Sequence, residues 1–183
     1  MLSLVTFDVQ GAYNGVHKHT LAVRLWERGI PTTLIKWINS FCSNRKACIT
    51  FDRFCSDTMD IAQAGLPQGS PLSPILYIFY NVNLVQAPIN FKRGAIAFVD
   101  DYSAWVTGPN ASANTAKLQQ TFIPRAMNWA RESEATFEVD KTELIHFTRV
   151  KRKDERPHLP IIVNGKTILL SEQVKLLGVV LDL

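Results

Sequence analysis

Two aspartates stand side by side at Asp100 and Asp101, where the apolar run AIAFV (95–99) ends and shortly before a second one, SAWV (103–106), begins. Carboxylates this close repel each other and favour protonation, unless a cation lies between them or water screens them well. Asp is a common turn residue, so a solvated hairpin turn is one interpretation, and from these residues alone the more frequent one. A metal site is the other. The pair by itself leaves both open.

A third carboxylate has the same setting. Asp8 follows the apolar run SLVTF (3–7), just as Asp100 follows AIAFV, so each acid stands at the carboxyl end of a predicted strand. If these strands lie side by side in one sheet, Asp8 meets Asp100 and Asp101 at one edge. That much negative charge is costly without a cation, whereas two Mg²⁺ ions would stabilise it. Paired metals about 3.5–4 Å apart clamp the attacking and leaving oxygens of a phosphoryl transfer.

Two helices are predicted after the first strand. The pattern from about His19 to Arg28 is helical and is closed by Gly29, a usual stop signal. A second helix is predicted to begin near Thr32 or Thr33, either of which could cap it. We expect its apolar stripe to be core, and this stripe consists of Leu34, Trp37, Ile38 and Phe41.

A loop punctuated by glycine and proline, GLPQGSPLSP (65–74), runs straight into an apolar segment. Ser73 followed by Pro74 fits an N-cap with proline at the first helical position, which predicts a buried helix from Ile75 to Val85. Before this loop, the runs ACITF and TMDIA predict a hairpin of two strands.

The second half of the chain predicts one long helix and more strands. The helix runs from Ser112 to about Glu134, with a kink at Pro124. The segment 137–147 alternates enough to predict an extended hairpin, and Asn-Gly within 161–170 is the strongest hairpin signal. A last apolar strand, 175–183, reaches the end, which suggests a piece of a longer protein. The apolar face of the long helix consists of Leu118, Phe122, Ala126 and Trp129.

Composition excludes several classes of protein. The 183 residues are 46% hydrophobic and 20% charged, as in one soluble globular domain and unlike a disordered or collagen-like chain. No apolar run approaches the roughly 20 residues that cross a bilayer, and no secretory leader is evident. We therefore expect no membrane partner and an intracellular location, in the nucleus or the cytoplasm. Three cysteines without a Cys-x-x-Cys pair argue against a disulfide framework.

The net charge of +4 is a weak indication of a nucleic-acid partner. The positive residues are bunched at 43–46, 91–93 and 149–156. Each cluster alone is more often a solvated face than a binding patch.

Five motifs follow one another along the chain: FDVQGAY (7–13), GLPQGSPLSP (65–74), FVDD (98–101), DKTELIHF with its Lys141, and KLLGVVLD (175–182). Their order resembles that of reverse transcriptases, in particular those of non-LTR (LINE-like) retrotransposons. A lone Phe-x-Asp-Asp is weak evidence. The joint appearance of GLPQGSPLSP between an Asp-bearing strand and the Asp-Asp hairpin is strong, and the resemblance covers nearly the entire chain.

This resemblance implies a metal site and its ligands. Asp8 and Asp100 would be the principal metal ligands, with Asp101 beside them and the backbone carbonyl of Val9 as a further ligand. The cofactor would be two Mg²⁺ ions, with Mn²⁺ as a possible substitute.

The resemblance also assigns residues to the substrates. Tyr13 would pack under the sugar of the incoming nucleotide and disfavour a 2′-hydroxyl, although an ordinary core aromatic is the alternative. Gln68 would touch nucleotide and template, and Gly69 would let backbone approach the substrate closely. Lys141 would place positive charge, and a proton, on the departing pyrophosphate, where a solvent-facing lysine is the alternative. Gly178 would allow close approach in a hairpin that steadies the primer.

The sequence thus predicts an α+β fold, the palm of a reverse transcriptase with an antiparallel β-sheet backed by helices, partial fingers and no thumb. It is predicted as a single partial domain, 1–183, with the palm and its catalytic motifs in 1–148 and a basic connection and primer-grip-like hairpin in 149–183. The predicted activity is RNA-templated DNA synthesis. The partners would be an RNA template, a DNA primer, deoxynucleoside triphosphates, and the fingers, thumb and endonuclease regions of a longer polyprotein.

Two other interpretations compete with an active polymerase. One is a catalytically inactive remnant that keeps the fold and at most binds nucleic acid. The other is a cyclase-type palm, which would share the carboxylates but would not need GLPQGSP. One departure from the motif pattern is Tyr13-Asn14 where Phe-Asp is frequent, which removes an acid but no predicted metal ligand.

Overall fold

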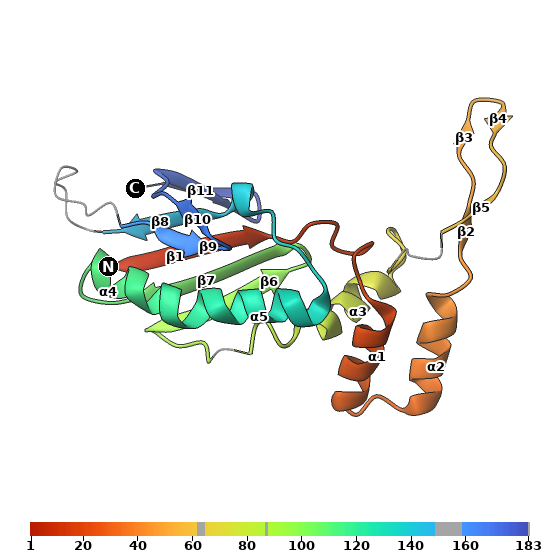
Figure 1. The fold of residues 1–183 in the computed structure, drawn as a ribbon, viewed down its shortest axis with the longest axis horizontal. Coiled ribbons are helices and arrows are strands. Elements are labelled where there is room, and N and C mark those ends of the chain that lie inside the picture. The colour runs from red at the N-terminus through yellow and green to blue at the C-terminus, as the bar shows by residue number, and fades with distance from the viewer. Residues whose placement is uncertain (62–64, 87, 149–158, 183) are drawn as a thin grey trace. The chain divides into compact units, whose positions relative to one another are not determined.

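The computed structural model describes residues 1–61, 65–86, 88–148 and 159–182 (Figure 1). The chain divides into two compact units, one made of Met1–Gln10 with Asn81–Leu183 and the other of Gly11–Tyr80. None of the helices in these described ranges has the length and apolar character that crossing a bilayer requires.

The first unit is built on a four-stranded antiparallel sheet in the order β6-β7-β1-β8. Its strands are β6 (Arg93–Phe98), β7 (Asp101–Thr107), β1 (Leu2–Asp8) and β8 (Glu143–Phe147). The two predicted strands that end at Asp8 and Asp100 are β1 and β6, and both belong to this sheet. The prediction that they lie side by side is wrong, because β7 lies between them and pairs with both.

One face of this sheet is backed by a long helical run (Figure 1). It consists of α4 (Ala111–Lys117), the π-helical segment η1 (Leu118–Phe122) and α5 (Ile123–Ser133). The apolar face predicted for this helix is confirmed, since Leu118, Phe122, Ala126 and Trp129 are all buried. The wider π turn lies directly before Pro124, where the missing proline N–H removes a bond of the regular helix.

An aromatic cluster fills the space between the sheet and the helical run. The ring of Phe137 lies 5.2 Å from Phe7, 5.7 Å from Trp129 and 6.5 Å from Tyr102, measured between centroids.

The extended hairpin predicted for 137–147 is wrong. Phe137 forms an isolated bridge to Val9, the 3₁₀ turn η2 (Val139–Lys141) follows, and only then does β8 begin.

Two short hairpins complete the first unit. The Asn-Gly prediction is confirmed: β9 (Ile161–Val163) pairs with β10 (Lys166–Ile168). The predicted last strand is instead a second hairpin, of β11 (Gln173–Leu176) and β12 (Val179–Asp182). Its turn consists of Leu177 and Gly178, both with positive φ. The hairpin contributes to an apolar cluster on the sheet face opposite the helices, made of Leu4, Ile145 and Val174 with Trp105 and Leu181 around them.

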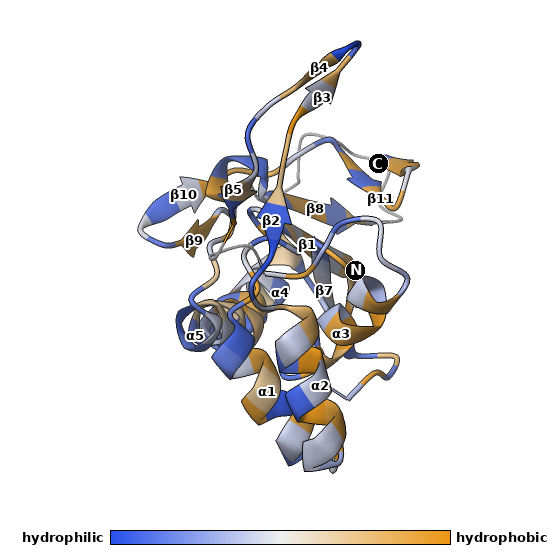
Figure 2. Ribbon diagram, turned by 90° about the vertical axis from the view of Figure 1, so that its right-hand side faces the viewer, coloured by the Kyte–Doolittle hydropathy of each residue, from blue (hydrophilic) through white to orange (hydrophobic). Residues whose placement is uncertain are grey.

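The second unit contains three helices and a long hairpin. The helices are α1 (Lys18–Glu27), α2 (Thr32–Phe41) and α3 (Leu72–Asn81), and Figure 2 colours stretches of α1 and α2 as hydrophobic. The predicted hairpin is confirmed in two short ladders, in which β2 (Lys46–Ala47) pairs with β5 (Met59–Asp60) and β3 (Thr50–Phe51) pairs with β4 (Phe54–Cys55).

The buried face of α2 differs from the predicted one. Leu34 and Trp37 are 44% and 55% exposed, whereas Ile35 and Ile38 are buried. Trp37 instead stacks on Phe41, with the ring centroids 5.9 Å apart. The threonine cap is also absent, because the N-cap position is Pro31 and no side chain caps the helix.

The helix predicted from Ile75 to Val85 begins earlier and is only half buried. α3 spans Leu72–Asn81, so Ser73 lies inside it and donates its hydroxyl to the carbonyl of Pro67 at 2.5 Å. Ile75 and Ile78 are exposed, while Leu76, Tyr77 and Tyr80 are buried. The helix is thus amphipathic, and its continuous apolar sequence concealed this.

Candidate active site

Asp8 and Asp101 face each other at one end of the sheet. Asp8 ends β1, Asp101 begins β7, and the two residues are directly opposite in the antiparallel register. In the next pair the N–H of Val9 donates to the carbonyl of Asp100 at 2.9 Å, so Asp8 and Asp101 form a non-hydrogen-bonded pair. Side chains in such pairs lie on one face with Cβ atoms about 4.5–5.5 Å apart. The backbone therefore presents two carboxylates together.

Asp100 lies in the two-residue turn between β6 and β7, next to a strained residue. Phe98 pairs with Asp101, which leaves Val99 and Asp100 as the turn. Val99 has a φ of 52°, a conformation that β-branched residues rarely adopt. Such strain costs on the order of 1–3 kcal/mol and persists where the surroundings impose it. Asp100, which is exposed, thus follows a strained residue and directly precedes Asp101 of the facing pair.

Asn81 helps to impose this turn. Its side-chain amide donates to the carbonyl of Val99 at 2.9 Å, and the residue is buried. The oxygen of the same amide, Oδ1, is buried without a hydrogen-bond partner. A buried amide is retained at that cost when its donor does something specific, which here is to hold the carbonyl of the strained residue. Sequence reasoning missed Asn81.

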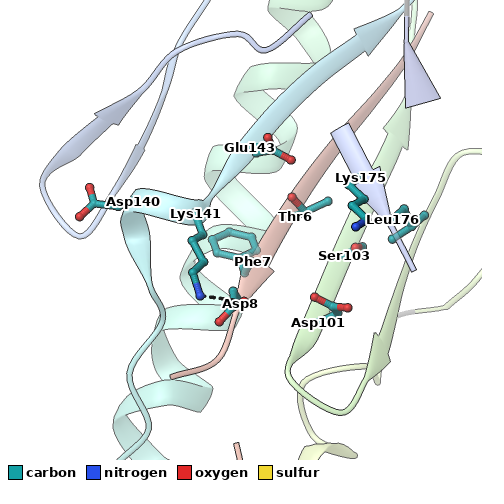
Figure 3. A pocket seen from close by; sticks show the side chains of 10 residues that line it. All are labelled: Thr6, Phe7, Asp8, Asp101, Ser103, Asp140, Lys141, Glu143, Lys175 and Leu176. Atoms are coloured by element: carbon teal, nitrogen blue, oxygen red, sulfur yellow. Dashed lines mark hydrogen bonds and ion pairs between the residues drawn. The ribbon is translucent and has the colours of Figure 1, made fainter. Parts of the chain in front are cut away.

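The facing pair lines a cavity of about 370 Å³ in the first unit (Figure 3). Sheet residues form its floor, the turn η2 contributes Asp140 and Lys141, and β11 contributes Lys175 and Leu176. In Figure 3, Lys141 lies on the Asp8 side and Lys175 on the Asp101 side. The floor consists of Thr6, Phe7, Asp8, Asp101, Ser103 and Glu143.

Lys141 bridges two carboxylates. Its Nζ lies 2.6 Å from Oε2 of Glu138 and 3.4 Å from Oδ2 of Asp8. The pKa of the Lys141 ammonium is raised, chiefly by the hydrogen bond to Glu138; desolvation opposes this rise, and the negative charge of Asp8 adds to it. The lysine predicted from the sequence therefore lies at the aspartates, although half of its side chain is open to solvent.

The electrostatics of Asp101 show crowding of negative charge. Burial raises the pKa of its carboxyl above the ordinary value, and the neighbouring charges of Asp100 and Asp8 raise it further. A carboxylate in such surroundings is stabilised by a bound cation.

The donor chemistry at this edge fits Mg²⁺, which binds carboxylate oxygens and keeps several waters. Asp8 and Asp101 supply a facing pair, and Asp100 directly precedes Asp101 in the chain. Over the described ranges, no three acidic, histidine or cysteine side chains converge closely enough to hold a metal as they are placed. Val9, the other predicted ligand, is buried at its bridge to Phe137.

Three predicted substrate residues belong to the second unit. The carbonyl of Tyr13 accepts the N–H of Leu66 at 2.7 Å, and its half-buried ring meets that of Tyr77 edge-on at 5.4 Å. Gln68 is exposed in a turn. Gly69 has a φ of 86° and open space where a Cβ would be, so its backbone conformation is what requires glycine in this structure.

Sequence reasoning passed over Gly65 as a structural requirement. A Cβ at this position would clash with the backbone of Tyr13 and Val16. The absence of a side chain is therefore what lets the start of the GLPQGSPLSP loop lie against the segment that carries Tyr13. Gly178, by contrast, has open space around it and a φ of 85°, as its turn requires.

Comparison with known proteins gives a consistent result. The family model described as reverse transcriptase (RNA-dependent DNA polymerase) matches residues 2–181. A probable RNA-directed DNA polymerase from the transposon X-element of Drosophila melanogaster is 25% identical over 96% of the chain and 19% of its own length. The RNA-directed DNA polymerase from the mobile element jockey of Drosophila funebris is 26% identical, with the same coverage.

Solved structures show the same fold. Apo telomerase from Candida tropicalis, truncated from its C-terminal domain, has a TM-score of 0.60 at 14% identity, covering 99% of this chain and 34% of that one. The apo telomerase of the same organism gives a TM-score of 0.59 at 12% identity, covering 99% and 31%. The predicted α+β palm is thereby confirmed.

The fold and the family match define a nucleic-acid polymerase palm of the reverse-transcriptase class. This chain belongs to the reverse transcriptase family, and the resemblance to non-LTR retrotransposon enzymes is confirmed. It spans about a fifth of the length of the curated relatives it matches.

Proposed function

We propose that this chain is the catalytic palm of a retrotransposon reverse transcriptase and carries RNA-templated DNA synthesis by two-metal nucleotidyl transfer. The observation that supports this most is the facing pair of Asp8 and Asp101, with Asp100 held beside it on a strained turn. Asp8 and Asp101 line a cavity that Lys141 and Lys175 line as well. Oxygen ligands for cations and amines for phosphates are thus together in one place.

Asp8, Asp100 and Asp101 would hold the two Mg²⁺ ions, with the carbonyl of Val9 as a further ligand. When bound, the metals would neutralise charge on the attacking and leaving oxygens. Catalysis of this kind depends on positioning and charge more than on covalent chemistry. The contribution of Lys141 would be to hold a proton at its Nζ beside the departing pyrophosphate, and general-acid help of that type is worth about 10²–10⁴-fold.

The substrates would be an RNA template, a DNA primer and deoxynucleoside triphosphates. Tyr13 would stand at the sugar of the incoming nucleotide, Gln68 would contact nucleotide and template, and Gly69 would let backbone come close. The hairpin with Gly178 would steady the primer, and the adjacent Lys175 would offer charge to its phosphates. The basic cluster 149–156 lies outside the described residues.

Primer extension tests the proposal. The experiment measures Mg²⁺- or Mn²⁺-dependent extension of a DNA primer on an RNA template by this chain, by its Asp100→Asn variant, and by a longer chain that includes the neighbouring sequence. We expect Asp100→Asn to abolish extension while leaving the fold intact, because Asp100 is exposed and its replacement removes repulsion.

Extension by the Asp100→Asn variant at the parent rate would contradict the metal assignment. Activity only in the longer chain would show an intact palm that needs its neighbouring regions. Absence of extension by both chains would favour the alternative function, a catalytically inactive remnant that keeps the fold and at most binds nucleic acid.

A further inference from the structure

Glu138, to which the sequence gives no role, is tied to the end of β1. The N–H of Gln10 donates to the carbonyl of Thr136 at 2.8 Å, and Val9 forms a bridge with Phe137. The N–H of Glu138 then donates to the carbonyl of Asp8 at 2.9 Å. These backbone contacts fix Glu138 next to Asp8 independently of any side chain.

The side chain of Glu138 continues this connection. It lies 2.6 Å from the Lys141 ammonium, which in turn lies 3.4 Å from the Asp8 carboxylate. The N–H of Lys141 also donates to the carbonyl of Glu138 at 2.9 Å, so the 3₁₀ turn itself sets their spacing. One ammonium is thus shared by two carboxylates, and the contact with Glu138 is the shorter.

We propose that Glu138 is a positioning residue, which retains the Lys141 ammonium at the edge of the site when a divalent cation takes Asp8. This inference rests on the proposed function. A cation bound to Asp8 repels a nearby ammonium, and Lys141 without a second partner must either compete for Asp8 or leave. The Glu138 carboxylate offers the Lys141 ammonium a second ion-pair partner. Lys141 can release Asp8 and remain within reach of a triphosphate.

Amine labelling of the full chain without metal tests whether Glu138 holds Lys141. The acetylation rate of each lysine under limiting N-hydroxysuccinimide acetate at pH 8 is read by peptide mass spectrometry, with Lys175 as internal reference. We expect Glu138→Gln to accelerate labelling of Lys141 about two- to fivefold, the range that exposed ion pairs support. Glu143→Gln is the matched control, because it removes an equal charge from the same cavity and has no contact with Lys141 among the described interactions.

Mn²⁺ binding tests the consequence for the site, with free Mn²⁺ followed by electron paramagnetic resonance. Without Glu138 the ammonium depends on Asp8 alone, so we expect Glu138→Gln to weaken Mn²⁺ binding about two- to fivefold, again within the range of an exposed ion pair. In a Lys141→Met background the same substitution should have no more effect than Glu143→Gln. Such a double-mutant cycle isolates the coupling between Glu138 and Lys141.

The outcomes separate this inference from the proposed function. A Lys141 labelling rate that is unchanged by Glu138→Gln, or changed equally by Glu143→Gln, would overturn the positioning role and leave the metal assignment intact. Equal weakening of Mn²⁺ binding with and without Lys141 would overturn it too, since Glu138 would then act only through its own charge. Mn²⁺ binding that Asp8→Asn does not weaken would remove the basis of the proposed function, and with it the metal-dependent half of this inference.

Discussion

At the scale of single residues, the position of Asp101 lowers the free energy of unfolding. Partial burial raises the pKa of its carboxyl, and the neighbouring charges of Asp100 and Asp8 raise it further. A carboxyl whose pKa is higher in the folded chain than in the unfolded chain makes the folded protein less stable as the pH rises from the lower to the higher of these two pKa values. The facing pair therefore destabilises the metal-free fold at neutral pH.

Replacing Asp101 by Asn should relieve this cost. We expect the free energy of unfolding at pH 7, without metal, to rise by about a few tenths of a kcal/mol, a small gain because the carboxylate is largely exposed and water screens it. Urea denaturation of both proteins at pH 7 and pH 4 measures the effect. The gain should shrink toward pH 4, and an equal gain at both pH values would contradict the electrostatic cause.

His146 has the opposite pH dependence. It is buried, its Nδ1 lies 2.7 Å from the hydroxyl of Ser3, and that hydroxyl also accepts the side-chain amide of Asn114 at 2.9 Å. Its Nε2 has no partner, and burial lowers the pKa of the ring below 6.5. The unfolded chain therefore binds the proton more readily than the folded one.

We expect stability to fall as the pH decreases from 7.5 to 5.5, by at most about 1.4 kcal/mol per pH unit for one proton. The urea midpoint of the parent protein, compared with that of His146→Gln at each pH, measures this. The variant should be less stable at pH 7.5 but show a shallower decline. A decline of equal slope in both proteins would assign the effect to other groups.

At the scale of elements, strong local signals predicted the strands and turns. Alternating or apolar runs that end at Asp8 and Asp100 predicted β1 and β6, and Asn164-Gly165 predicted the hairpin of β9 and β10. Each signal acts within a few residues, so no partner elsewhere in the chain is needed to read it.

The elements that were mispredicted depend on distant partners. In α2, Ile38 belongs both to the stripe with Leu34 and Phe41 and to the stripe with Ile35 and Cys42, and packing buries the second. The sequence has helical spacing for either face, so the spacing alone does not determine which face of α2 is buried. In the same way, the position of Phe137 depends on its packing in the aromatic cluster. Asn81 donates a hydrogen bond to a turn eighteen residues away. No local sequence pattern indicates either contact.

Two hairpin turns of the first unit, those between β9 and β10 and between β11 and β12, offer an internal comparison. Asn164-Gly165 and Leu177-Gly178 both have positive φ at each position, the form of turn for which Asn-Gly is preferred. Leu177 is exposed, so its side chain contributes little packing there.

Leu177→Asn should therefore stabilise the fold by about 1 kcal/mol, because the short polar side chain of Asn tolerates the left-handed region, which costs most other L-residues roughly 1–2 kcal/mol. Urea denaturation at pH 7 measures it. The control is Asn164→Leu, which should destabilise by a similar amount. Loss of stability on Leu177→Asn would mean that the leucine side chain packs in solution.

At the scale of the whole molecule, the net charge of +4 predicts an electrostatic contribution to nucleic-acid binding. Fluorescence anisotropy of a labelled primer–template should show affinity falling linearly with salt on logarithmic axes, with a slope of about −0.7 to −0.9 for each phosphate neutralised. Lys175→Ala should reduce that slope by about one contact, whereas Lys36→Ala, an exposed lysine outside the cavity and the basic clusters, is the control. Affinity that is unchanged between 50 and 200 mM salt would contradict a phosphate-contacting surface.

The position of β1 in the sheet has a consequence for synthesis of the chain on the ribosome. β1 is translated before both of its partners, since Leu2 pairs with Thr107 on one side and with Phe147 on the other. The strand therefore has no neighbours until β7 and β8 have been made, and contacts this distant in sequence form slowly. Nascent β1, an apolar strand with two open edges, must stay shielded for that whole interval, so we expect this protein to be an obligate client of chaperones that act at the tunnel exit.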